Sequence, residues 1–128
     1  MILDLYEKEF QNKYGFNLKE LYYSYIIRIL NKKISNKSVK DIAYDISNSI
    51  LNKIDRNETL RHILYKRKEK IFFTNRTIIH IIAIKYKDIY FVFEIKDKNN
   101  MLKVKKWYLK NEAEIENEEK DNGYEQIY

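Results

Sequence analysis

Apolar residues along the first half of the chain recur at steps of three and four, which is the spacing of one face of a helix. The first segment with this spacing carries Leu3, Tyr6, Phe10 and Tyr14. Gly15 follows it, and glycine is typical of the residue that ends a helix. The pattern therefore predicts a first helix that ends near residue 14.

Two longer helices are predicted over residues 17–32 and 38–54, where wide apolar stripes follow capping signals. A short fourth helix is a candidate from residue 57 to about residue 68, with its apolar residues turned inward. A polar loop is expected between the second and third helices. The capping pairs are Asn17 with Glu20 and Ser38 with Asp41.

After residue 70 the apolar period becomes two, and β-branched and aromatic residues dominate. This pattern predicts four strands joined by tight polar turns, at residues 70–74, 77–86, 89–96 and 101–109. The turns are expected at residues 75–76, 87–88 and 97–100. The predicted fold class is α+β: three N-terminal helices, with the candidate fourth, packed on a C-terminal antiparallel meander of about four strands in two layers.

The charge of the chain changes sign near its end. Residues 1–110 carry 24 Lys and Arg against 12 Asp and Glu, whereas residues 111–128 carry seven acids and only Lys120. We expect a single α+β domain over 1–110 and an acidic, loosely ordered tail over 111–128. Ile, Lys, Asn and Tyr make up 65 of the 128 residues, which indicates an AT-rich genome and weakens net charge as evidence for nucleic acid.

Signals for catalysis and for cofactors are scarce. The chain has no Cys, which excludes disulfides, thiolate metal sites and Cys nucleophiles, and its two Gly exclude a Gly-rich phosphate loop. We expect no cofactor, no metal site and no catalytic residue, so an enzyme is the less favoured class. No apolar run reaches the roughly 18 residues of a membrane span, and no signal peptide follows Met1. We therefore expect a cytoplasmic protein without a membrane partner.

Two basic features are candidate nucleic-acid-binding sites. One is the run from Arg61 to Lys70, and the other is the last strand, where lysines and a tryptophan are expected to alternate on one face. Lysines beside an exposed aromatic ring are typical of surfaces that bind single strands, because charge follows the backbone and the ring stacks on a base. The candidate residues are Arg61, Lys66, Arg67, Lys103, Lys105 and Trp107.

The acidic residues of the tail form a candidate partner-binding site. Such a polyanion can screen the basic body or enter a basic groove of another protein, and its alternative is a solvated tail. The candidates are Glu112, Glu114, Glu116, Glu118, Glu119 and Asp121.

The missing chemistry and the separated charges favour a small non-enzymatic binding or inhibitory protein with a protein or nucleoprotein partner. Such proteins include phage or mobile-element accessory proteins that antagonise host defence, as anti-CRISPR proteins do. One alternative is a metal-independent ribonuclease toxin with His62 or His80 as the base and an arginine on the phosphate. Another is an immunity or antitoxin protein whose acidic tail covers a basic enzyme cleft.

Overall fold

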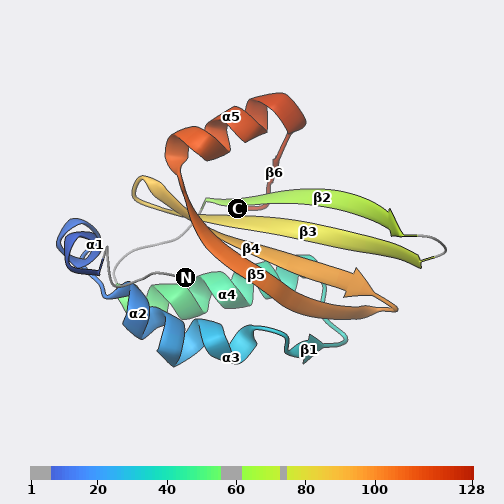
Figure 1. Cartoon of the computed structure of the whole chain (residues 1–128), viewed down its shortest axis with the longest axis horizontal. Coiled ribbons are helices and arrows are strands. Elements are labelled where there is room, and N and C mark those ends of the chain that lie inside the picture. The colour runs from blue at the N-terminus through green and yellow to red at the C-terminus, as the bar shows by residue number, and fades with distance from the viewer. Residues whose placement is uncertain (1–6, 56–61, 73–74) are drawn as a thin grey trace.

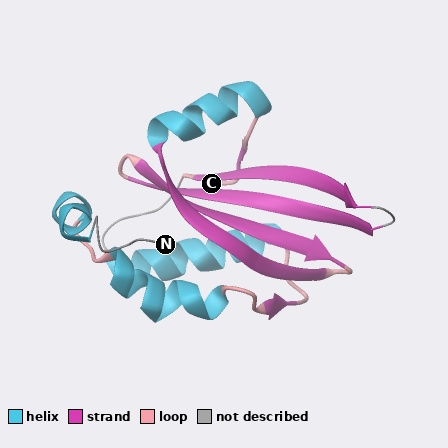
Figure 2. Ribbon diagram, in the orientation of Figure 1, coloured by secondary structure: helices cyan, strands magenta, loops and turns pink. Residues whose placement is uncertain are grey.

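The computed structural model describes residues 7–55, 62–72 and 75–128, and only the backbone at residues 71, 72, 75, 121 and 122. Its described part is an α+β fold around an antiparallel sheet of six strands in the order β1-β5-β4-β3-β2-β6. The helices before the sheet cover one face, and a last helix lies on the other (Figures 1 and 2). The predicted α+β class is therefore confirmed.

The N-terminal helices follow their sequence signals. Helix α1 covers Glu7–Tyr14 and ends at Gly15, whose φ of 80° lies in the left-handed region that favours glycine. A continuous helical run then consists of α2 (Leu18–Leu21), the π-helical turn η1 (Tyr22–Ile26) and α3 (Ile27–Ile29). The side chain of Asn17 caps its start by accepting a hydrogen bond from the Glu20 amide at 3.0 Å.

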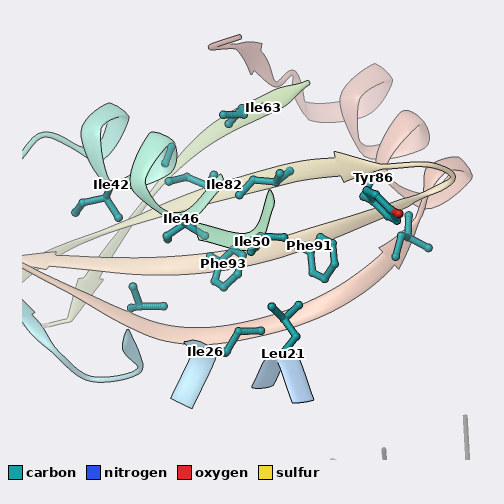
Figure 3. Close-up of a cluster of buried hydrophobic side chains, with 14 of the residues drawn as sticks. Leu21, Ile26, Ile42, Ile46, Ile50, Ile63, Ile82, Tyr86, Phe91 and Phe93 are labelled. Atoms are coloured by element: carbon teal, nitrogen blue, oxygen red, sulfur yellow. The ribbon is translucent and has the colours of Figure 1, made fainter. Parts of the chain in front are cut away.

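Helix α4 (Val39–Ile54) is the longest helix of the described chain. Ser38 and Asp41 form the predicted capping box, in which each side chain accepts a hydrogen bond from the backbone amide of the other residue. Ile42, Ile46 and Ile50 lie along one face of the helix and are buried against the sheet (Figure 3). This core also includes Ile82, Phe91 and Phe93 from the central strands.

In the described ranges, the sheet has six strands rather than about four. Four long strands form its body, and two-residue strands at each edge come from segments that the sequence predicted as loop and tail. The strands are β1 (Lys33–Ile34), β2 (Ile63–Phe72), β3 (Asn75–Tyr86), β4 (Ile89–Lys98), β5 (Met101–Asn111) and β6 (Glu125–Gln126).

The turns of the meander form without glycine. Lys87 has a φ of 53°, and Asn99 and Asn100 have φ values of 55° and 61°, as two-residue hairpin turns require. The prediction of a first turn at residues 75–76 is wrong, because Asn75 and Arg76 already pair with Phe72 and Ile71 in the β2–β3 ladder.

Strand β2 overturns the candidate fourth helix over residues 63–68, whereas residues 57–61 lie outside the described part. Ile63 and Leu64 are adjacent in the chain, yet both are buried, in core clusters on opposite faces of the sheet. This is the alternation of a strand, and ten residue pairs join β2 to β3. The apolar spacing is compatible with a helix and with a strand, and pairing with β3 stabilises the strand.

The expectation that all helices precede the sheet is also wrong. Helix α5 (Glu112–Asn122) follows β5 and lies on the second face of the sheet. Its Ile115 has no exposed surface and packs in a cluster with Leu64, Ile81, Ala83, Tyr90 and Val92. Part of the molecule therefore has three layers, and the third layer is built from residues that the sequence assigned to the tail.

Candidate nucleic-acid interface

Lysines gather on the face of the sheet that carries α5. Leu102 and Val104 are buried in the core on the opposite face, so alternation turns Lys103 toward this one. Lys103 pairs with Lys33 of β1 on one side and with Lys96 of β4 on the other. Because paired residues of antiparallel strands share a face, three lysines stand side by side, about 5 Å apart at the backbone.

These lysines line a hollow with a volume of about 440 Å³ near the turn between β4 and β5. Helix α5 lies over the other end of the sheet, where β5 passes into it, and the strands extend beyond it toward this turn (Figure 1). The lining contains no carboxylate. We call its lysines the first band: Lys33, Lys96, Lys98, Lys103 and Lys105.

A second band consists of Lys66, Lys68 and Lys70 along β2. The Nζ atom of Lys66 lies 5.5 Å from the ring centroid of Tyr124, which places this lysine on the α5 side of the sheet. Burial lowers the pKa of Lys66, and the charge of neighbouring Lys68 lowers it further. Period-two alternation turns Lys68 and Lys70 to the same face. Together, the two bands are named the lysine face.

In the described part of the chain, few carboxylates lie near these lysines: Glu94 is on the same face of β4, and the charge of Glu118 acts on Lys66. Among the described residues, no lysine of either band forms an ion pair with a carboxylate; Lys105 instead donates a hydrogen bond to Asn31 Oδ1 at 2.8 Å. Like charges directly opposite each other destabilise a sheet, so the row of Lys33, Lys103 and Lys96 lowers stability. A bound anion would remove this repulsion.

A β-bulge overturns the expectation that Lys103, Lys105 and Trp107 share one face. Glu94 pairs with Lys106 while Ile95 pairs with Val104, so Lys105 is the extra residue of β5. The bulge shifts the alternation by one. Trp107 therefore turns toward the N-terminal helices, where it stacks on Tyr22 with ring centroids 6.0 Å apart.

Arg67 does not join the lysine face through its side chain. Arg67 alternates with Lys66 and Lys68 on β2, so it points to the opposite face, and it pairs with Glu69 at 3.3 Å. Arg61 lies outside the described residues. Sequence reasoning thus identified Lys66, Lys103 and Lys105 but did not select Lys33 and Lys98. Lys33 lies in a segment predicted as loop, and its place depends on pairing between distant parts of the chain.

Several acidic candidates of α5 are engaged within the chain. Glu112 pairs with Lys85 at 2.5 Å, and Glu118 pairs with Lys110 and accepts a hydrogen bond from the Tyr124 hydroxyl. Glu114 accepts a hydrogen bond from the side chain of Asn111, the N-cap of the helix. Glu116 and Glu119 are exposed, and the side chain of Asp121 lies outside the described part.

His80 is a buried, hydrogen-bonded histidine with 6% of its surface exposed. Its Nδ1 lies 2.6 Å from the Tyr65 hydroxyl, and its Nε2 lies 3.4 Å from Asp97 Oδ2. Burial lowers the pKa of His80, an effect that outweighs the opposing influence of Asp97. The other histidine, His62, is half-buried near Gln126. The two rings belong to different environments and do not form a joint acid–base pair.

The lowered pKa of His80 predicts a pH-dependent stability. The ordinary pKa of histidine is about 6.5, and below it the unfolded chain binds a proton that the folded chain binds less readily. The free energy of unfolding should therefore decrease as the pH is lowered. Urea denaturation between pH 7 and 5.5 should show a steeper loss for the natural chain than for His80→Gln. An equal loss of stability in the two proteins would contradict a lowered pKa of His80.

No group of three His, Cys, Asp or Glu side chains in the described ranges is arranged to hold a metal ion. Across the same ranges, none of the helices has the length and apolar character needed to cross a membrane.

Comparisons with protein-family models, with curated proteins and with solved structures gave no match to this chain. Evidence for a function therefore comes from the geometry of the lysine face.

Proposed function

We propose that this protein is a non-enzymatic binding protein that holds nucleic acid by its phosphate backbone on the lysine face. The observation that supports it most directly is the row of Lys33, Lys103 and Lys96 on neighbouring strands. A polyanion is the ligand that converts this repulsion into binding energy, because phosphates neutralise several lysines at once and release counterions.

Two simpler explanations account for less of this arrangement. Lysines protect exposed sheet edges from pairing with other chains, but Lys96 belongs to β4, which has a strand on each side. A lysine-rich composition explains the number of lysines in the chain. It does not explain why three of them pair directly with one another while carboxylates are missing from the hollow around them.

The proposal keeps the class of function expected from the sequence and makes its ligand specific. A nucleoprotein presents the same phosphate chemistry, so an accessory protein that inhibits a nucleoprotein would use the face in the same way. By contrast, the acidic residues of α5 that pair with Lys85 and Lys110 are partly occupied within the chain, which gives the immunity-protein alternative less support.

Salt dependence tests this proposal. Fluorescence anisotropy with labelled nucleic acids should show binding at about 50 mM salt that weakens steeply as salt is added. If the five lysines of the first band contact phosphates, the logarithm of the association constant should fall with the logarithm of salt concentration at a slope of about −3 to −5. No binding of RNA or DNA at low salt would refute the proposed function.

A further inference from the structure

The lysine face separates into two bands with an uncharged stripe between them. Lys96 of the first band pairs with Ile79 of β3, and Ile79 pairs with Lys68 of the second band. Two strand spacings therefore separate the bands, or about 10 Å at the backbone. Thr77, Ile79 and Ile81 form the stripe, since they alternate along β3 on the same face.

We infer that the occupant of this face is double-stranded RNA, an inference that depends on the proposed nucleic-acid function. Two bands of cations with a neutral stripe between them match a duplex groove, where two phosphate backbones flank a space without phosphates. Each band would contact one backbone, and the stripe would lie over the groove. A single strand offers one backbone and needs only one band.

The shape of the face favours an A-form duplex. The B-DNA major groove is read by elements that enter it, such as a helix or a two-stranded ribbon. On the described lysine face, the bands lie on the sheet itself, and the projecting element is α5, which carries exposed Glu116 and Glu119 that repel phosphate. The A-form minor groove is wide and shallow, so a sheet surface can reach both backbones and the 2′-hydroxyls between them. Thr77 lies in this stripe opposite Lys70, and its hydroxyl is a candidate partner for those groups.

Among the side chains that the structure describes, the lysine face has no freely exposed aromatic ring of the kind that a single-strand site uses. Single-strand binding uses aromatic rings on which unstacked bases lie. Trp107, the tryptophan of the chain, is turned to the opposite face by the bulge at Lys105. Tyr108 and Tyr124 do lie on the α5 side, but both are half-buried beside the α5 cluster. Backbone contacts without base stacking are what duplex recognition requires, because paired bases are hidden.

The test compares four labelled probes of one mixed sequence of about 24 nucleotides: duplex RNA, duplex DNA and each single strand. At about 0.1 M salt, duplex RNA should bind at least about tenfold more tightly than single-stranded RNA, and more tightly than duplex DNA. Equal affinity for duplex and single-stranded RNA would overturn the inference while leaving the proposed function intact. Tighter binding of duplex DNA would overturn the choice of RNA.

Removing the second band gives a sharper test. The double variant Lys68→Ala/Lys70→Ala should lose duplex RNA affinity about tenfold or more and leave single-strand affinity within about twofold. The matched control, Lys40→Ala/Lys53→Ala, removes two exposed lysines from α4 and should retain the duplex preference. An equal loss of affinity for duplex and single-stranded RNA would show that the two bands do not bind separate phosphate backbones. Failure of every probe to bind the natural chain would instead refute the proposed function.

Discussion

Lys103→Glu should weaken nucleic-acid binding on the order of 100-fold at 0.1 M salt and make the protein more stable. Lys103 stands between Lys33 and Lys96, so a glutamate there loses one phosphate contact and draws both neighbouring lysines away from the ligand. The same glutamate replaces two like-charge pairs by two opposite-charge pairs, each of which contributes about 0.2–1 kcal/mol. Anisotropy titrations and thermal denaturation measure the two effects on one sample.

The matched control for this variant is Lys53→Glu, which makes the same change in net charge on an exposed position of α4. It should reduce affinity by no more than about threefold, because its separation from the lysine face leaves only the screened, long-range part of the charge. Equal losses in the two variants would show that net charge alone governs binding. A Lys103→Glu variant that is less stable than the natural chain would contradict the repulsion inferred from the strand register.

The sequence predicted elements well where local signals and packing agree. The capping pairs at Asn17 and Ser38 begin helices in the structure, and the asparagines before Met101 form the predicted turn. At Ile63 and Leu64 local spacing suited a helix, and pairing with β3 gave a strand. The local pattern cannot distinguish a helix from a strand here, because either structure can bury Ile63 and Leu64 against apolar neighbours.

The candidate site was harder to predict from the sequence, because it depends on the register in which the strands pair. The alternation of Lys103, Lys105 and Trp107 in the sequence suggested one shared face, but a single extra residue at Lys105 moves Trp107 to the other side. The pairing of Lys33 with Lys103 joins segments 70 residues apart, which no local pattern reports. The bulge thus changes the predicted ligand from an unstacked single strand to a duplex.

Loss of the α5 anchor should have the largest effect on stability. Ile115 is fully buried among Leu64, Ile81, Tyr90 and Val92, so Ile115→Ala should lower the free energy of unfolding by about 2–5 kcal/mol. The control is Ile27→Ala, which removes the same atoms from a side chain that is 44% exposed and should change stability by less than about 1 kcal/mol. Urea denaturation of both variants provides the comparison.

Deletion of residues 112–128 extends this test to the whole C-terminal segment. The truncation uncovers the apolar cluster beneath α5 and removes the hydrogen bonds by which Ile127 and Tyr128 join the backbone of Ile63. We expect a large fall in melting temperature or aggregation, opposite to the result that a loosely held tail predicts. An unchanged melting temperature would support the loosely ordered tail. A large fall would show that α5 and the segment after it cover apolar surface of the sheet that the other helices leave open, because those helices pack on the opposite face.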